Sequence, residues 1–410
     1  MKSLIYKCME YKSTIKEFYK LNKSDFDSSL QKKKQSIDTF TFDFKIHESN
    51  SFFHYDHVIF EKVINVETKN VKLNSIFESL PKIARNQYIR NTLVAEVKNT
   101  NELEGVFSSR KEIFELTEDL KKRDSDKIGS IVNKYLLLLD NKAEQEIASC
   151  KDIRNIYNAL FNIGGGKSLI AEKDMPDGIY FRKGFVGVYD GLGNLIHKGI
   201  AGENAIIEAV QEGLSILNNN EMNLFIRLAI FHYIFEYAHP FYDGNGRIGR
   251  YLISSIIKKE KSDIFAFRVS SGINARKNKY YRAFKDTEDV RNCGDLGTFV
   301  YEFLDIFEKE YDNSIEYALS KQKLLEKLCD EYIESQSKLS KSEKNILYVL
   351  IQARVFSDFG VSVKEISDAT NSSSKTVRRS ILKFKDLKIV SEEKYGKTYY
   401  YNLINSNILN

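Results

Sequence analysis

The stretch from His239 to Arg250 brings together side chains that suit chemistry on a phosphate group, and it reads HPFYDGNGRIGR. A histidine such as His239 can act as a base near neutral pH. Asp243 supplies a hard oxygen ligand suited to Mg²⁺, since this ion usually binds through one or two carboxylates plus substrate phosphates. Gly244 and Gly246 allow the backbone to approach a ligand closely. These residue types at this spacing predict a nucleotidyl or phosphoryl transfer site.

Apolar side chains recur every three to four residues on both sides of this stretch, at Leu224, Leu228, Phe231 and Phe235 before it and at Ile248, Leu252, Ile253 and Ile256 after it. This spacing is typical of helices, so a loop between two helices is expected. The N–H groups that open the second helix have no partner within it and favour an anion. Arg247 and Arg250, three residues apart, are expected to reach further phosphate oxygens. Phe241 is expected to anchor the loop in the core.

The same residues resemble a known signature. His239 to Arg250 matches the Fic-domain pattern HPFx[D/E]GNGRxxR at every defined position. Most proteins with this pattern transfer AMP from ATP to a hydroxyl of a protein side chain. The resemblance implies that His239 deprotonates a Ser, Thr or Tyr hydroxyl of a target protein, or of the chain itself. It also implies that Asp243 holds Mg²⁺ on the α- and β-phosphates of ATP.

The resemblance places the other nucleotide contacts at the start of the second helix. Gly244, Asn245 and Gly246 would form the anion hole for the α-phosphate. Arg247 would contact the β-phosphate, and Arg250 would reach the γ-phosphate. These roles agree with the chemistry, because charge develops on phosphoryl oxygens and catalysis rests on positioning and electrostatic stabilisation.

An upstream segment, Thr100 to Gly105, reads TNELEG and resembles the inhibitory motif [S/T]xxxE[G/N] of autoinhibited Fic proteins. It is expected at the end of a helix from about residue 84 to 104, with Thr100 and Glu104 on one face and Gly105 as the helix terminator. The resemblance implies that Glu104 pairs with Arg250 and occupies the γ-phosphate position. ATP would then be unable to bind productively until this restraint is relieved.

Residues 161–204 are rich in loops and would contain the flap that holds a target. Phe185, Val186, Gly187, Val188 and Tyr189 are expected to form a strand. A turn at 190–194 and a return strand at 195–197 would complete a hairpin. Such a hairpin can bind an extended peptide by strand pairing. The proline-containing stretch that usually follows is replaced by GIAG at 199–202.

The C-terminal residues 341–410 resemble a winged helix-turn-helix, with helices expected at 343–353, 363–369 and 373–387 and two strands after them. The third helix would carry Lys375, Arg378 and Arg379 as contacts to DNA. Between residues 361 and 400 there are nine Lys or Arg against five Asp or Glu, a basic excess that suits phosphates. Two alternatives to DNA binding are equally open for this domain, namely dimerisation and docking of a target protein. A homodimer of the chain is also open.

The composition is that of a folded, mainly helical protein. Of 410 residues, 42% are hydrophobic and 29% charged, which excludes a disordered chain, and the net charge of +5 excludes one that is basic throughout. Three prolines and recurrent helical patterns predict a mainly α fold with small β elements. The resemblance implies that this fold contains a Fic helical core with a small hairpin flap. No export signal or membrane span is expected, and the four cysteines form no CxxC pair, so a cytoplasmic protein without a membrane partner is predicted.

Three segments are expected along the chain. Residues 1–80 would form a small mixed region capping the core, in which alternation at 39–44 and at 58–63 predicts short strands. Residues 81–334 would form the Fic core, and 341–410 the winged helix.

Two other functions stay open from the sequence alone. One is a DNA-binding regulator whose Fic site senses a nucleotide without turnover, although sensing would not require His239. The other is the reverse reaction, removal of AMP with Glu104 positioning water. No residue in the sequence indicates which nucleotide base the site recognises.

Overall fold

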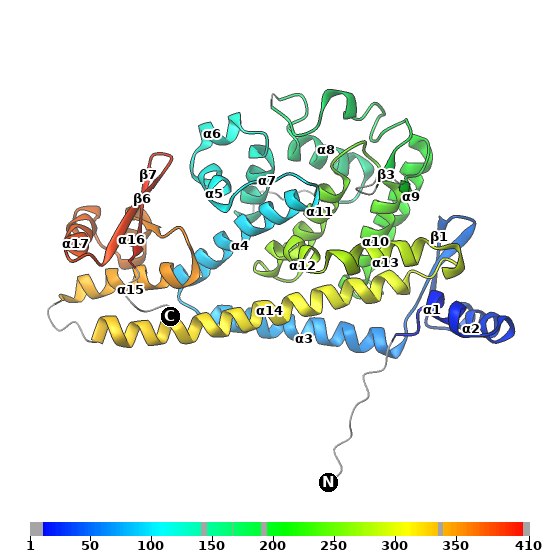
Figure 1. Ribbon diagram of the computed structural model, residues 1–410, viewed down its shortest axis with the longest axis horizontal. Coiled ribbons are helices and arrows are strands. Elements are labelled where there is room, and N and C mark those ends of the chain that lie inside the picture. The colour runs from blue at the N-terminus through cyan, green and yellow to red at the C-terminus, as the bar shows by residue number, and fades with distance from the viewer. Residues whose placement is uncertain (1–10, 141–145, 166, 190–194, 335–338, 405–410) are drawn as a thin grey trace, which may run out of the picture. The chain divides into compact units, whose positions relative to one another are not determined.

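The computed structural model describes residues 11–140, 146–165, 167–189, 195–334 and 339–404, and helices dominate it (Figure 1). The α-helices are α1 (Thr14–Lys20), α2 (Lys23–Gln35), α3 (His57–Ser79), α4 (Lys82–Leu103), α5 (Arg110–Glu118), α6 (Leu120–Ser125), α7 (Gly129–Leu139), α8 (Cys150–Leu160), α9 (Glu203–Leu217), α10 (Leu224–Ala238), α11 (Asn245–Glu260), α12 (Val269–Ala275), α13 (Lys277–Glu288), α14 (Gly297–Cys329), α15 (Lys341–Phe356), α16 (Val363–Thr370) and α17 (Ser374–Asp386). The strands are β1 (Thr39–Ile46), β2 (Ser49–His54), β3 (Gly187–Tyr189), β4 (Leu195–Lys198), β5 (Val361–Ser362), β6 (Val390–Tyr395) and β7 (Thr398–Leu403). They form three small antiparallel sheets, so the prediction of a mainly α protein with small β elements is confirmed.

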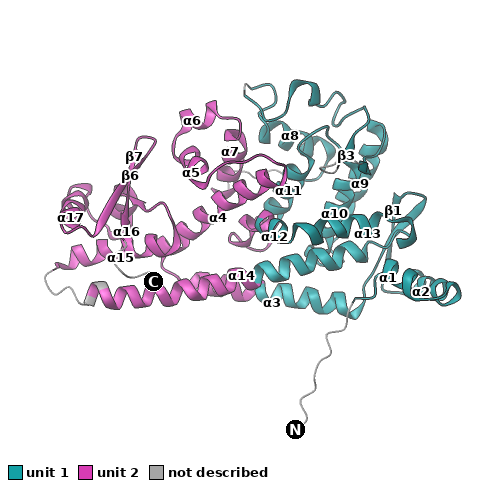
Figure 2. Ribbon diagram, in the orientation of Figure 1, with its two compact units in different colours: residues 1–69, 144–256, 271–311 teal, residues 70–143, 257–270, 312–410 magenta. Residues whose placement is uncertain are grey.

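The chain divides into two compact units (Figure 2). Unit 1 comprises residues 1–69, 144–256 and 271–311, and unit 2 comprises residues 70–143, 257–270 and 312–410. These units group the chain differently from the three segments expected from the sequence, and that division into segments stays a prediction. Within the described residues, none of the helices combines the length and the apolar character that a membrane span requires.

Helix α10 forms the centre of unit 1, because nearly all of its residues are buried. It packs against α9, and Phe225 in its first turn meets Phe307 and Tyr311 of α14 edge-on. A helix that is apolar around its whole circumference must be covered on every side. The core therefore holds the C-terminal end of α10, where residues 239–250 begin; we call these residues the site loop.

The N-terminal segment packs into the same unit. Strands β1 and β2 pair as an antiparallel hairpin, and Phe52 forms an isolated bridge with Asp295. Thr14 Oγ1 donates to Asp295 Oδ2 over 2.5 Å, and the His47 N–H donates to the Tyr237 hydroxyl over 3.2 Å. This region therefore contributes to the core of unit 1 and contacts the end of α10.

The strand expected at Val58 to Val63 is wrong, since these residues lie in α3. Ile59, Val63 and Val66 are buried whereas Phe60 is exposed, and this spacing of three to four residues marks one face of a helix. β-branched side chains favour strands only weakly, so a long helical pattern overrides that preference.

Unit 2 is built around α4 and α15. The Ala84 N–H of α4 donates to Gln352 Oε1 of α15 over 3.2 Å, and Arg90 Nη1 of α4 donates to Glu365 Oε1 of α16 over 3.1 Å. Residues 341–403, which we call the C-terminal module, contain α15 to α17 and a sheet of order β5-β7-β6. The three helices and the two longer strands lie where the sequence predicted them.

Candidate active site

His239 follows the last residue of α10 in a left-handed backbone conformation, with φ of 49°. Its N–H donates to the Phe235 carbonyl over 3.0 Å, which closes the helix. The ring Nδ1 lies 3.2 Å from the Glu236 carbonyl. A carbonyl can only accept, so Nδ1 carries the hydrogen and the lone pair of the neutral ring is on Nε2. The helix end thus gives His239 a defined basic nitrogen.

A buried arginine that the sequence analysis missed fixes the backbone around His239. The Arg182 guanidinium donates over 2.5–3.2 Å to four carbonyls, those of Gly184, Ile200, Ala238 and His239. Its backbone N–H donates to the Pro240 carbonyl over 3.0 Å. Arg182 is fully buried, and its planar fork of five N–H groups suits several fixed acceptors. It ties the site loop to the segment from 184 to 200.

Aromatic side chains on and beside α8 support the site loop. Phe241 is fully buried and stacks on Tyr157 with ring centroids 3.7 Å apart, so its expected anchoring role is confirmed. The Tyr157 hydroxyl donates to the Asp243 carbonyl over 3.0 Å. Burial, and then the nearby Asp243 carboxylate, raises the pKa of Tyr157, so it remains a donor. Gly244 has φ of +86°, and a Cβ there would lie 2.7 Å from the Phe161 ring, so the loop requires glycine.

Asn245 spans the site loop with its side chain. Its Oδ1 accepts from the Phe241 N–H over 2.9 Å, and its Nδ2 donates to the Phe241 carbonyl over 2.8 Å. The amide therefore holds the loop closed, and one of its hydrogens remains for a ligand. The α-phosphate contact implied for Asn245 stays a prediction, as does that of Gly246.

Arg247 is the buried cation of the site loop. It is 3% exposed, its Nη2 donates to Asp243 Oδ1 over 3.0 Å, and its guanidinium lies 4.9 Å from the centre of the Phe161 ring. Among the described residues, its buried Nε and Nη1 find no hydrogen-bond acceptor. Buried donors are nearly always satisfied, so these two N–H groups indicate a ligand that accepts. The N–H groups opening α11 point to the same chemistry, because Gly244 before them has no side chain to cap the helix.

The residues present fit a magnesium ion delivered with a nucleotide. Over the described ranges, no group of three or more His, Cys, Asp or Glu side chains could hold a metal. Asp243, with 43% of its side chain exposed, offers one carboxylate at the loop. Mg²⁺ can combine one such carboxylate with substrate phosphates and waters. Asp243 is therefore the residue that would hold the ion, and Mg²⁺ and ATP stay predictions.

Arg250, on the next turn of α11, is 2% exposed and lies near the fully buried His232 of α10. Burial, and then the positive charge of Arg250, lowers the pKa of His232 to about 3. The His232 ring is therefore neutral near pH 7, and its Nε2 lies 2.7 Å from the Tyr280 hydroxyl. A neutral neighbour allows Arg250 to keep its charge inside the fold.

The predicted flap (residues 185–197) is present as the antiparallel pair β3 and β4, although β3 begins at Gly187 and so covers only part of the strand expected from residue 185. Its predicted turn, 190–194, lies outside the described residues. Phe185, Leu195 and Ile196 are each a little more than half exposed. Val186, Gly187 and Val188 lie beside them at the start of the hairpin, and the flap offers an apolar surface together with strand edges. Target docking there stays a prediction.

His197 fastens the flap to its surroundings. Its Nε2 lies 2.8 Å from the Tyr237 carbonyl, and its Nδ1 lies 2.8 Å from Glu288 Oε1. Both partners are acceptors, so the ring connects the flap to α10 and to α13. A Cβ at Gly199 would lie 2.6 Å from the Arg182 guanidinium and 3.0 Å from His239. The glycine that begins the GIAG segment therefore lets the flap return close to His239.

The predicted regulatory residues belong to unit 2, whereas the site loop belongs to unit 1. Helix α4 ends at Leu103, and Gly105 has φ of +75°, so the expected helix and its glycine terminator are confirmed. Thr100 is buried in the last turn. The pairing of Glu104 with Arg250 stays a prediction.

Comparison with known proteins identifies the segment that carries these contacts. Residues 148–257 match the Fic/DOC family. They form a Fic domain. A protein named probable protein adenylyltransferase, from Aquifex aeolicus, is 35% identical over 72 residues, which cover 18% of this chain and 20% of that protein. The chain thus matches about a fifth of that relative's length. A crystal structure of a Fic family protein from Desulfovibrio desulfuricans G20 has a TM-score of 0.49 at 16% identity, covering 84% of this chain and 97% of that one.

The Fic domain contains most of the contacts that shape the site. It begins just before α8, includes the flap and Arg182, and ends within α11, so it carries both His239 and Arg247. Glu288, which bonds His197 of the flap, lies outside it. Residues beyond the Fic domain therefore help to hold its flap.

Proposed function

We propose that the chain is a protein adenylyltransferase that transfers AMP from ATP to a side-chain hydroxyl of a protein. The observation that carries this proposal is Arg247, whose buried Nε and Nη1 have no acceptor among the described residues. A polyphosphate supplies anionic acceptors for such donors. The name of the Aquifex aeolicus relative supports the same chemistry.

In the proposed reaction, Nε2 of His239 accepts the proton of the target hydroxyl. The hydroxyl oxygen bonds to the α-phosphorus, and the bond from that phosphorus to pyrophosphate breaks. Arg247 and the N–H groups opening α11 stabilise negative charge on the phosphoryl oxygens. Asp243 would hold Mg²⁺, which neutralises phosphate charge when bound.

The flap is the proposed docking element for the target backbone. Exposed strand edges can add an extended peptide, and the exposed Phe185, Leu195 and Ile196 supply apolar contact area. The bonds of His197 and Arg182 fix both ends of this hairpin relative to His239. Main-chain pairing reads little sequence, so the flap alone does not distinguish Ser, Thr and Tyr.

Replacing Arg182 by lysine is expected to lower the rate of transfer about 10- to 100-fold, because misplacing a catalytic group by about 1 Å can cost about 10²-fold. A lysine ammonium is a single point with three donors and cannot span four carbonyls. The measurement is kcat and KM for ATP, determined separately. A fall in kcat with little change in KM indicates lost positioning and not lost ATP binding. Arg282→Lys, on the exposed face of α13, is the matched control, and equal kcat for the two variants would contradict the positioning role.

Replacing Glu104 by glycine is expected to raise AMP transfer about 10- to 100-fold, because one charge-assisted pair is worth about 1.5–3 kcal/mol. The proposed reason is that the Glu104 carboxylate competes with the γ-phosphate for Arg250. The experiment incubates wild type and variant with Mg²⁺ and ATP labelled on either the α- or the γ-phosphate, alone and with cell lysate. Label on protein is expected from α-labelled ATP alone.

Glu102→Gly, in the same helical turn as Glu104, controls for damage to the end of α4. If wild type and Glu104→Gly incorporate the same amount of label from α-labelled ATP, the proposal that Glu104 inhibits transfer is wrong. The proposal that the chain transfers AMP is not affected by that result. Label from the γ-phosphate alone would indicate a kinase instead. No label from any variant would overturn the transfer proposal itself.

A further inference from the structure

Helix α17 of the C-terminal module has one buried face and one charged, exposed face. Its buried side consists of Val377, Ser380, Ile381 and Phe384. Lys375, Arg378 and Arg379 are exposed on the remaining surface, and we call these three residues the α17 face. Lys375 lies three residues before Arg378 and four before Arg379, so it is a neighbour of both arginines on the helix surface and can contact one extended ligand together with them.

The α17 face follows a tight turn after α16. Asn371 has φ of 48°, which ends α16, and the Ser373 hydroxyl accepts from the Thr376 N–H over 3.2 Å, which caps α17. Two helices joined by so short a turn, with β6 and β7 pairing after them, form a helix-turn-helix arrangement. In this arrangement the second helix presents its N-terminal residues outward.

The other sides of the C-terminal module pack against the remaining helices of unit 2, the unit to which the module belongs. Phe359 stacks on Phe114 of α5 with ring centroids 3.9 Å apart, and Arg90 of α4 donates to the Tyr400 hydroxyl over 3.0 Å. At the turn between β6 and β7, a Cβ on Gly396 would lie 3.0 Å from Asp119. The sides formed by α15, α16 and the β6-β7 hairpin are therefore engaged with the unit's own helices.

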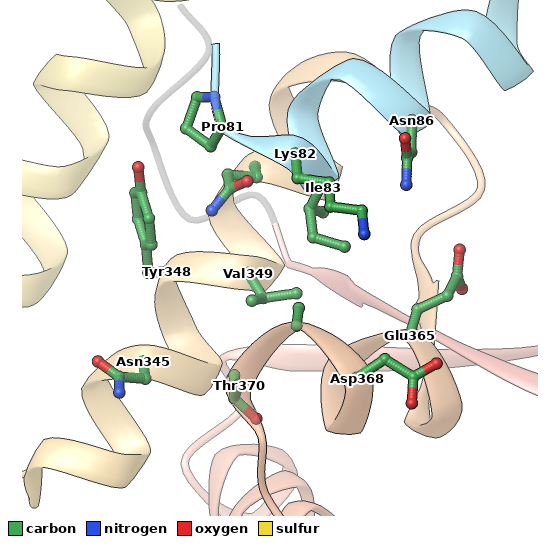
Figure 3. A pocket seen from close by; sticks show the side chains of 12 residues that line it. Pro81, Lys82, Ile83, Asn86, Asn345, Tyr348, Val349, Glu365, Asp368 and Thr370 are labelled. Carbon is green, nitrogen blue, oxygen red and sulfur yellow. The ribbon is translucent and has the colours of Figure 1, made fainter.

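A cavity of about 520 Å³ lies on this engaged side, lined by the start of α4, by α15 and by α16 (Figure 3). The α17 face does not line it, and α17 lies at the edge of unit 2, away from α4 (Figure 2). Packing within unit 2 therefore leaves the α17 face to solvent.

The cations of the α17 face differ from other cations of the same helix in having no carboxylate partner within the described part of the chain. Lys383 is paired with Glu343 over 2.7 Å, and Lys385 is paired with Glu392 over 3.2 Å. Lys375, Arg378 and Arg379 form no ion pair with any residue that the structure describes. Three unneutralised cations on one helix suit a regular array of phosphates.

We propose that the α17 face binds duplex DNA. An α-helix fits the major groove of B-form DNA, whereas the deep and narrow major groove of A-form RNA excludes it. Lys375, Arg378 and Arg379 contact phosphates or base edges from the N-terminal half of α17. This activity is independent of AMP transfer, because none of the three residues belongs to the Fic domain.

The test measures fluorescence anisotropy of a labelled, mixed-sequence DNA duplex of about 30 base pairs with the full chain. If three phosphates are neutralised, affinity is expected to fall about 40-fold between about 50 and 200 mM salt. The variant K375E/R378E/R379E is expected to lose at least about tenfold in affinity and to show a shallower salt dependence. An RNA duplex of the same sequence is expected to bind more weakly.

The control is K20E/K23E/K32E, which makes the same change of charge at exposed lysines of α1 and α2. It separates the local effect of the α17 face from the effect of net charge. Unfolding midpoints of both triple variants show whether the fold is retained. No binding of the DNA duplex at low salt, equal affinity for RNA, or equal losses in the two triple variants would overturn the proposal.

Discussion

Replacing His239 by alanine is expected to lower AMP transfer about 10²- to 10⁴-fold, the usual contribution of a general base. The bond from Nδ1 to the Glu236 carbonyl leaves Nε2 as the proton acceptor. The ring of His197 lies 6.5 Å away between centroids, but each of its nitrogens already lies 2.8 Å from an acceptor. The base acts on the target hydroxyl and not on the nucleotide, so ATP affinity is expected to stay nearly constant. The measurement combines the initial rate of α-label incorporation in the Glu104→Gly background with calorimetric ATP binding.

His57→Ala is the matched control, because His57 is exposed at the first residue of α3. Its transfer rate is expected to equal that of the parent. A His239→Ala rate within about tenfold of the parent would mean that another group removes the proton. A parallel loss of ATP affinity would mean that His239 holds the nucleotide and is not the base.

The site loop could be predicted from the sequence because its parts are neighbours in the chain. Apolar spacing in α10 and α11 places a loop between two helices, and both helices and the buried Phe241 lie where that pattern requires. The flap strands and the end of α4 at Gly105 were predictable for the same reason, since local turn and cap residues mark them.

Contacts between distant segments could not be predicted. Arg182 and His239 are 57 residues apart, and His197 and Glu288 are 91 residues apart. Every residue carries a backbone carbonyl, so an arginine that binds carbonyls leaves no complementary charge in the sequence. Asn245 illustrates the same limit. An asparagine side chain suits a phosphate contact as well as the hydrogen bonds that Asn245 makes to the backbone of the site loop, so its residue type does not decide between the two.

Short apolar patterns are also ambiguous without their surroundings. The alternation at 58–63 fits a strand over six residues, but buried positions at Val66, Leu73 and Phe77 continue it as a helix. Strand β1 contacts α9, and its Phe44 meets Tyr237 of α10 edge-on. Contacts of this kind need no sequence motif, since they use apolar side chains and backbone bonds such as that from the His47 N–H to the Tyr237 hydroxyl.

Replacing Arg247 by methionine is expected to lower AMP transfer about 10²- to 10³-fold, the usual cost of removing a donor that stabilises a developing anion. Stability is expected to change little, because methionine can still pack on Phe161 and the half-exposed Asp243 is solvated by water once its partner is lost. Methionine also removes two buried donors that have no acceptor among the described residues, and with them the free-energy cost of burying these donors unsatisfied. The thermal unfolding midpoint of Arg247→Met is therefore expected to stay nearly constant or to rise.

The measurement is kcat/KM together with the thermal unfolding midpoint, with and without ATP. Arg247→Lys is expected to recover part of the activity, since an ammonium keeps the charge but not the fork of donors. Arg282→Met, on the exposed surface of α13, serves as the control for losing a positive charge elsewhere. If Arg247 only held the loop together, Arg247→Met would instead unfold at a lower temperature, and ATP would stabilise variant and wild type equally. A large loss of activity without a loss of stability is thus expected only if the buried guanidinium is kept for a ligand and not for the fold.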